Sequence, residues 1–384
     1  MRTVLPYAPA LDGLRGVCIA LVVACHAGLP LPGAWIGVDG FFVLSGYLIT
    51  ALLCAEHATR GRLALGAFWG RRAARLLPAL AALLVVVGVG AAAGVPGWGD
   101  GPTAWGIVGA LTYSSNWLRA ALPLGPGGAD PLGALAHTWS LAVEEQFYLL
   151  WPPLLAGALA AGWSRRRLAA GLALAAALGA GWAAWLWATG PWDYGALQRL
   201  YGGLDTHGAG LLLGALLALV PARGPRWARQ AGLIGVLAAG AVAVLIDVPA
   251  PIRYGAGGLL GVAGGWALLV AHLTAGAPGA AVRLLRAPPL VWLGRLSYSL
   301  YLWHYPVFAV LAPPGGGTLD GPGQIAGIGA ALALAAASYY GLEQPVRDVV
   351  RRRLAAGRAG GQDAVLIDLT GGKVHPGDEP ISSR

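Results

Sequence analysis

Long apolar runs, separated by short Arg-rich blocks, constrain this chain more than any other feature of its sequence. A membrane-spanning helix needs about 20 consecutive, mostly apolar residues. About ten stretches of the 384-residue chain meet that criterion: roughly 11–29, 36–55, 76–95, 141–161, 168–189, 203–221, 231–248, 255–274, 290–312 and 324–342. The sequence therefore predicts an all-α, polytopic transmembrane helical bundle embedded in a lipid bilayer.

The shortage of charged residues supports this fold class. Asp, Glu, Lys and Arg make up 11% of the chain, against about 25% in a soluble domain. This composition excludes a disordered chain, an ordinary cytosolic enzyme and a nucleic-acid partner, although the formal net charge is +9. The three cysteines, Cys18, Cys25 and Cys54, all fall inside apolar runs, so no disulfide framework is expected.

The distribution of arginine predicts the orientation of the spans. Cytoplasmic loops of membrane proteins are enriched in Lys and Arg. With a cytoplasmic N-terminus and a non-spanning segment at 103–140, only Arg119, Arg199 and Arg253 fall outside. Counting 103–140 as an eleventh span would instead move the arginine run 165–167 outside. We therefore expect about ten spans, two cytoplasmic termini, and an extracytoplasmic or re-entrant segment at 103–140.

The domain organisation is expected to be simple. Residues 1–350 contain all the predicted spans and form one membrane-embedded domain, whereas 351–384 are polar and aperiodic. A segment of such composition buries too little apolar surface to fold, so we expect 351–384 to be a disordered cytoplasmic tail. The Ala-, Gly- and Arg-rich, Lys-poor composition suggests a high-GC bacterial genome and hence a bacterial cell membrane.

Ionisable residues inside spans are costly and usually functional, and the first span carries two. Arg15 and His26 are eleven residues apart, which is almost three helical turns, so both lie on one face about 16 Å apart. A snorkelling arginine and a hydrogen-bonded packing histidine are the structural alternatives. Their alignment on one face favours a shared functional role.

The run 137–148 (HTWSLAVEEQFY) is the densest polar stretch of the sequence. In a helix, His137, Ser140, Glu144 and Tyr148 recur at three- or four-residue spacing and form one polar stripe, with Glu145 beside it. Two carboxylates at the mouth of a span are unfavourable unless they form hydrogen bonds or take part in chemistry. The alternative is simple solvation near a loop.

Two later spans carry further candidates. Ser297, Tyr301 and His304 form a second polar stripe in the ninth span, where an interfacial aromatic belt is the alternative. Asp205 and His207 lie near the outer end of the sixth span. They either cap a helix N-terminus, where Asp is favourable, or belong to a site.

Arg72 and Arg75, in the run FWGRRAARLLP, are three residues apart on a predicted short helix. Paired guanidinium groups bind phosphates through two parallel hydrogen bonds, so this pair is a candidate anion clamp. The bias toward arginine on the cytoplasmic side explains the same residues without a function.

Taken together, these motifs resemble the acyltransferase-3 family of integral membrane proteins from about residue 10 to 350. The resemblance rests on Arg15-x10-His26, GVDGFFVLSGYLI, the Arg-x-x-Arg of Arg72 and Arg75, HTWSLAVEEQFYLLWP and SYSLYLWHYPV, in that order. Many relatives have Asp-x-Arg in the sixth span, where this chain has Asp205-Thr-His207. The resemblance implies transfer of an acyl group, most often acetyl, from a cytoplasmic acyl-CoA to a hydroxyl.

The candidate residues fit this chemistry. A hydroxyl is a poor nucleophile at neutral pH, so a base must take its proton as it attacks the thioester. His26 is the first candidate base and His137 the second. Glu145 or Glu144 is expected to orient the imidazole, as the third member of a hydrolase triad does.

The remaining roles concern charge stabilisation and the donor. An oxyanion needs a hydrogen-bond donor, for which Tyr148, Ser140 and a backbone amide remain alternatives. Arg72 and Arg75 are expected to hold the phosphates of the acyl-CoA cosubstrate at the inner face. No metal and no permanently bound cofactor are expected.

Two questions remain open at the level of sequence. A transporter of a sugar, lipid or proton is the rival class, because intramembrane His and Glu also serve proton relays, but the sequence lacks the inverted repeats typical of many transporters. Within the enzyme class, the first hypothesis for the acceptor is a carbohydrate, either a cell-envelope polysaccharide or a glycolipid. A glycosylated secondary metabolite such as a macrolide is the alternative.

Overall fold

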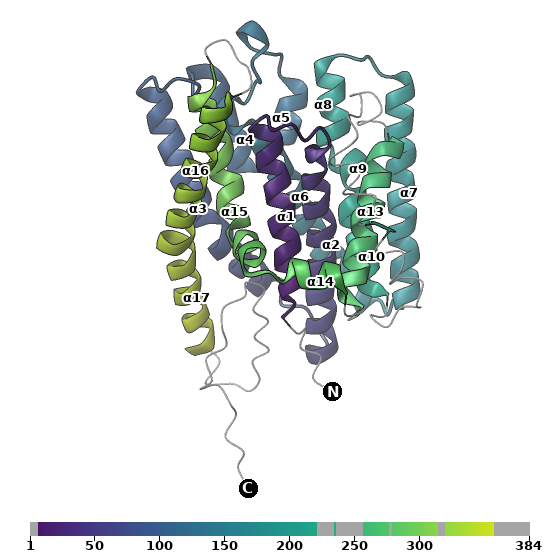
Figure 1. Ribbon diagram of the computed structural model, residues 1–384. Coiled ribbons are helices and arrows are strands. Elements are labelled where there is room, and N and C mark those ends of the chain that lie inside the picture. Colours follow the sequence, from purple (N-terminus) through teal and green to yellow (C-terminus); the bar gives the residue numbers. More distant parts are fainter. Residues whose placement is uncertain (1–6, 221–233, 236–255, 276–278, 314–318, 357–384) are drawn as a thin grey trace.

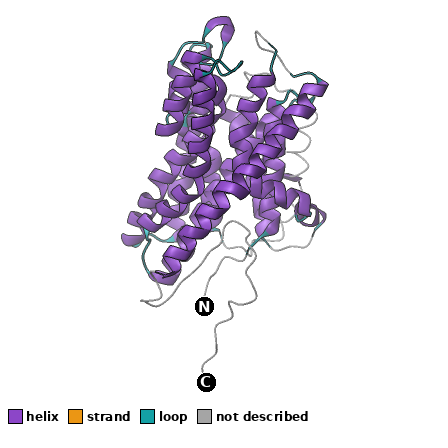
Figure 2. Ribbon diagram, turned by 90° about the vertical axis from the view of Figure 1, so that its left-hand side faces the viewer, coloured by secondary structure: helices purple, strands orange, loops and turns teal. Residues whose placement is uncertain are grey.

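The computed structural model describes residues 7–220, 234–235, 256–275, 279–313 and 319–356, and all regular elements in these ranges are helical (Figures 1 and 2). Eight helices of 18 residues or more form the body of the described bundle: α1 (Pro9–His26), α2 (Gly37–Arg60), α3 (Leu65–Ala92), α6 (Trp139–Ala160), α7 (Arg165–Thr189), α13 (Ala256–Thr274), α15 (Pro288–Leu311) and α16 (Gly321–Ser338). Helix α17 (Gln344–Ala356) also belongs to the bundle. The shorter helices are α4 (Asp100–Thr112), α5 (Ser115–Ala121), α8 (Tyr194–Gly202), α9 (Leu204–His207), α10 (Ala209–Leu219) and α14 (Ala280–Leu285).

Five helical segments of the described residues are long and apolar enough to cross a membrane: Pro9–His26, Ala34–Arg60, Leu65–Ala92, Arg165–Thr189 and Gly321–Arg352. This confirms the prediction of an all-α, multi-pass membrane protein. The count of about ten spans stays a prediction, and all but two residues of the run 231–248 lie outside the described residues. Helices α6 and α15 were predicted as spans and have sufficient length, but they are not among these five.

The segment 103–140 does not form one continuous helix. Helix α4 ends at Thr112, Tyr113 adopts a left-handed backbone conformation with φ of 51°, and α5 begins at Ser115. A non-glycine residue in this conformation breaks the helical hydrogen-bond ladder. Figure 1 shows α4 and α5 at the upper end of the bundle, and neither helix is a candidate span.

The Arg-rich termini of several helices gather at the opposite end of the bundle. Figure 1 shows the C-terminal ends of α2 and α17 there, together with α14; these elements carry Arg60, Arg351 and Arg283. We call this the Arg-rich end, and the end that holds α4, α5 and α8 the opposite end.

Helices α1 and α15 approach each other closely because glycines line their contact. A Cβ added at Gly16 would lie 2.2 Å from the Leu290 carbonyl oxygen, and one at Gly294 would lie 1.8 Å from that of Asp12. Small residues of this kind let helix backbones pack at short distance in membranes. The contact brings the α1 face that carries Arg15 and His26 onto α15.

Candidate active site

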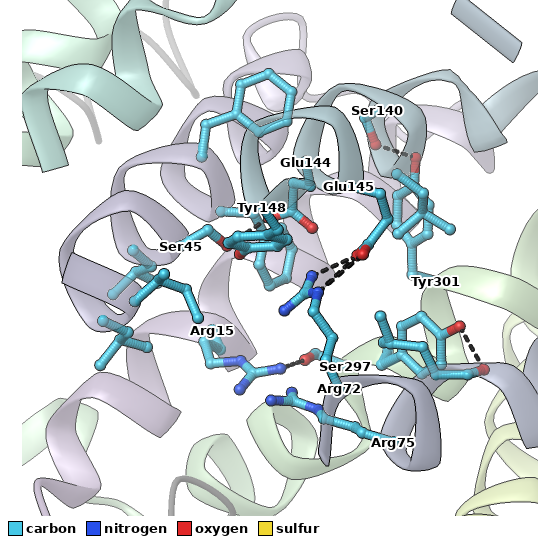
Figure 3. A pocket seen from close by; sticks show the side chains of 18 of the residues that line it. Arg15, Ser45, Arg72, Arg75, Ser140, Glu144, Glu145, Tyr148, Ser297 and Tyr301 are labelled. Carbon is cyan, nitrogen blue, oxygen red and sulfur yellow. Dashed lines mark hydrogen bonds and ion pairs between the residues drawn. The ribbon is translucent and has the colours of Figure 1, made fainter. Parts of the chain in front are cut away.

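A polar pocket opens among α1, α2, α3, α6 and α15, and Figure 3 shows the side chains that line it. We call it the arginine pocket, because Arg15, Arg72 and Arg75 all line it. Its other polar lining includes Glu144, Glu145, Ser140 and Tyr301. Residues from all five motifs found in the sequence therefore share one space.

Arg72 is fully engaged by its neighbours. Its Nε lies 2.9 Å from each carboxylate oxygen of Glu145, and its Cζ lies 3.3 Å from the centroid of the Tyr148 ring. The side chains of Arg72 and Glu145 are 15% and 13% exposed. Glu145 thus neutralises Arg72, and the tyrosine face supports it through a cation–π contact.

Arg15 and Arg75 have no carboxylate bound to them within the described residues. Arg15 Nη2 donates to Ser297 Oγ at 2.9 Å, whereas Arg75 forms neither a hydrogen bond nor an ion pair in the ranges that the structure describes. The charges acting on Arg75 come from three other arginines and from Glu343. Two cations that share a pocket without bound counter-charges favour an anionic ligand.

The expectation that Glu145 or Glu144 orients the imidazole of His26 is wrong in this structure. Glu145 binds Arg72, and Glu144 accepts a hydrogen bond from Ser45 Oγ. The physical reason is the register of α6, which directs both carboxylates into the arginine pocket. His26 lies about three turns from Arg15 along α1 and has a different partner.

That partner is His304 on α15. His26 Nδ1 lies 2.9 Å from His304 Nε2, and His304 Nδ1 lies 3.0 Å from the Leu300 carbonyl oxygen. A carbonyl only accepts, so His304 Nδ1 carries the proton and its neutral ring offers Nε2 as an acceptor. His26 Nδ1 must therefore donate, which leaves the lone pair of a neutral His26 on Nε2.

The accessibility of this pair differs between its members. His26 is exposed to solvent, whereas His304 is completely buried. The neighbouring rings include Tyr305, whose centroid lies 5.1 Å from that of His26. The arrangement combines a solvent-accessible imidazole with a buried partner that fixes its tautomer.

His137 lies beside this pair and precedes α6. Its ring is 2% exposed and stacks on Tyr305 with a centroid distance of 5.0 Å. Neither ring nitrogen forms a hydrogen bond within the described residues, although the Leu302 carbonyl lies nearby. Burial, together with the neighbouring His304 and His26, lowers the pKa of His137 well below its ordinary value, so its ring is neutral.

Tyr301 lies between the arginine pocket and the histidines. Its hydroxyl donates to the His137 carbonyl and lies 2.6 Å from Ser140 Oγ. Because the tyrosine proton goes to the carbonyl, Ser140 supplies the proton of the second bond. Ser140 is therefore not a free donor in this state.

Asp205 is not brought into the site. It accepts hydrogen bonds from Trp182 at 2.9 Å and from Arg199 at 2.6 Å, and its side chain is 44% exposed. Nearby His207 instead binds Asp39 on α2 at 2.8 Å, with both side chains at most 2% exposed. Among the described residues, no group of three or more His, Cys, Asp or Glu side chains is arranged to hold a metal ion.

Comparison with known proteins gives one family and several named relatives. The model of a family described as an acyltransferase domain, acyltransferase-3, matches residues 9–340. The chain is 33% identical over 325 residues to a peptidoglycan O-acetyltransferase of Listeria monocytogenes, covering 80% of this chain and 50% of that protein. It is also 33% identical over 336 residues to a putative peptidoglycan O-acetyltransferase of Bacillus subtilis, covering 80% of this chain and 49% of the relative.

A putative O-acetyltransferase of Staphylococcus aureus is 31% identical over 314 residues, which cover 79% of this chain and 51% of that protein. The chain thus matches about half the length of these curated relatives. No solved structure matches the chain significantly.

Proposed function

The chain belongs to the acyltransferase-3 family, and we propose on this basis that it is a membrane O-acetyltransferase that moves an acetyl group from acetyl-CoA to a carbohydrate hydroxyl. The observation that carries the proposal is the hydrogen-bonded series from His26 through His304 to the Leu300 carbonyl. This series holds the lone pair of an exposed histidine on Nε2, as a general base requires.

In the proposed reaction, His26 Nε2 accepts the proton of the acceptor hydroxyl while its oxygen bonds to the thioester carbonyl carbon. The resulting oxyanion collapses, the carbon–sulfur bond breaks, and the CoA thiolate takes the proton from His26. His304 stabilises the transient imidazolium by accepting from Nδ1 at 2.9 Å. This contact supplies the orientation that a carboxylate provides in hydrolase triads.

The donor site of the proposal is the arginine pocket. Arg15 and Arg75 have no bound carboxylate in the described residues and would hold the phosphates of the acyl-CoA cosubstrate. Glu145 binds the Arg72 guanidinium and the Tyr148 ring covers it. In this proposal Arg72 therefore does not bind phosphate, contrary to the expectation from sequence. It would organise the pocket wall. The Arg-rich end would then face the cytoplasm, with both termini on that side.

The proposed acceptor is a cell-envelope glycan. Two relatives are named for peptidoglycan, and this supports a polysaccharide acceptor for the present chain over a glycosylated metabolite. The proposed acceptor would approach the solvent-exposed His26 from the end opposite the Arg-rich end.

Reconstitution tests this function. Purified full-length protein would be incubated with acetyl-CoA and isolated peptidoglycan glycan strands, and the O-acetyl content of the strands measured by mass spectrometry. We expect acetyl-CoA-dependent O-acetylation that requires His26. Strands that remain unmodified, together with no acetyl-CoA binding, would refute the proposal. Acetylation of other glycans but not of peptidoglycan would change the acceptor only.

A further inference from the structure

The polar stripe on α15 binds both functional residues of α1. Ser297 accepts a hydrogen bond from Arg15, and His304 accepts one from His26. Ser297 and His304 are seven residues apart, which is about 10 Å along a helix. Tyr301 occupies the position between them.

Tyr301 forms the boundary between the two halves of the site. It lines the arginine pocket, and its ring centroid lies 5.3 Å from that of His137 and 5.5 Å from that of His304. Its side chain is 7% exposed. The ring is therefore in contact with the pocket on one side and with the histidines on the other.

Two hydrogen bonds hold Tyr301 in this position. Its hydroxyl donates to the His137 carbonyl and accepts from Ser140 Oγ at 2.6 Å. Both partners lie near the junction that leads into α6, so the bonds join α15 to α6 across the bundle. Figure 3 shows the Ser140–Tyr301 bond at the edge of the pocket, away from the three arginines.

We propose that Tyr301 is a gate, closed by Ser140 and the His137 carbonyl, that separates the donor pocket from His26 until donor and acceptor are both bound. This inference rests on the proposed function. A thioester held by Arg15 and Arg75 must bring its carbonyl carbon to the side of Tyr301 where His26 lies. The tyrosine side chain must therefore move during each reaction cycle.

The gate determines whether the acetyl group is transferred to the acceptor or the thioester is hydrolysed by water. His26 is exposed to solvent, so a thioester in permanent contact with it would meet water. In that side reaction His26 takes a proton from water, whose oxygen bonds to the acyl carbon. The carbon–sulfur bond then breaks, the thiolate takes the proton from His26, and acetic acid and CoA thiol leave. A closed gate keeps the thioester away from this base.

Hydrolysis in the absence of any acceptor tests the gate. The probe is acetyl-CoA alone with purified full-length protein, and the readout is release of free CoA thiol. Tyr301→Phe keeps the ring but loses both hydrogen bonds, whereas Ser140→Ala loses one. Each lost bond shifts an equilibrium several-fold to about tenfold, so we expect thiol release to rise in the order wild type, Ser140→Ala, Tyr301→Phe.

Controls identify the source of the thiol. Tyr47→Phe removes the hydroxyl of a tyrosine on α2 that does not line the pocket, and it should leave thiol release unchanged. Adding His26→Gln to Tyr301→Phe should abolish the extra release, because the base is lost. Binding of acetyl-CoA and thermal stability, measured for every variant, show whether the fold is intact.

The outcomes separate the two proposals. Thiol release from Tyr301→Phe and Ser140→Ala at or below the wild-type rate, with acetyl-CoA still bound, overturns the gate and leaves the proposed function standing. Extra release that persists without His26 also overturns the gate. A wild-type protein that neither binds acetyl-CoA nor acetylates glycan strands refutes the proposed function, and the gate falls with it.

Discussion

Replacing His304 with phenylalanine tests how the base is oriented. Phe keeps a ring at a completely buried position that already contacts Phe308 with centroids 5.8 Å apart, so little packing is lost. It removes the acceptor that lies 2.9 Å from His26 Nδ1. The tautomer of His26 is then no longer fixed, and the imidazolium formed during the reaction loses its partner.

The size of the effect follows from that one hydrogen bond. A hydrogen bond to a charged group contributes about 1.5–3 kcal/mol, and about 1.4 kcal/mol corresponds to a factor of ten in rate. We therefore expect kcat of His304→Phe to fall roughly tenfold to a hundredfold or slightly more. The KM for acetyl-CoA should stay unchanged, because His304 does not line the arginine pocket.

A matched variant separates orientation from packing. His304→Gln places an amide oxygen near the position of Nε2, so it can still accept from His26 Nδ1. Steady-state O-acetylation should show that His304→Gln recovers most of the activity that His304→Phe loses. Equal activity of His304→Phe and wild type would refute the claim that this contact orients the base.

Four further predictions concern the donor, the fold and the topology. Arg75→Ala should weaken acetyl-CoA binding about tenfold to a hundredfold, measured by calorimetry, and unchanged affinity would remove it from the donor site. Arg72→Ala should lower the free energy of unfolding by about 1.5–3 kcal/mol, because it leaves a carboxylate unpaired, and an unchanged Tm would contradict this. His207→Leu leaves the buried Asp39 carboxylate without its partner and should lower the free energy of unfolding by about 3–5 kcal/mol. An unchanged free energy of unfolding in denaturant titration would contradict a stabilising role for this pair. A cysteine introduced at Arg165 should resist labelling from outside the cell, and labelling there would reverse the topology.

Apolar run length and arginine placement were sufficient to predict much of the fold. They gave an all-α membrane bundle and a non-spanning segment at 103–140, and the break at Tyr113 explains why that segment is not one helix. Run length does not report how helices pair. The close contact of α1 with α15 depends on glycines such as Gly16 and Gly294, whose role becomes visible only when the facing backbone is known.

Residue spacing predicted the polar stripes but not their partners. The stripe of Ser297, Tyr301 and His304 followed from helical periodicity, and so did the shared face of Arg15 and His26. Periodicity orients side chains within one helix only. The pairing of His26 with His304 instead of a glutamate depends on the register between α1 and α15, which the sequence of neither helix contains.

One residue of the site, and one buried pairing outside it, were not foreseen from the sequence. Tyr305 stacks on His137 and contacts His26, and its only signal was its position beside His304. The buried pair of Asp39 and His207 joins segments 168 positions apart. The spacing of residues within one helix does not predict such a pair, because each member alone resembles a polar residue at a helix terminus.

If His26 is the base of acyl transfer, His26→Gln removes the proton acceptor from the reaction. Glutamine can hydrogen-bond the acceptor hydroxyl, but it cannot take its proton at neutral pH. The measurement is acetyl transfer from acetyl-CoA to glycan strands by purified protein, with acetyl-CoA binding recorded in parallel. A general base contributes about 10²–10⁴-fold, so we expect transfer to fall at least about a hundredfold with donor binding intact. Near-normal transfer by His26→Gln would contradict this expectation and make His137 the next candidate.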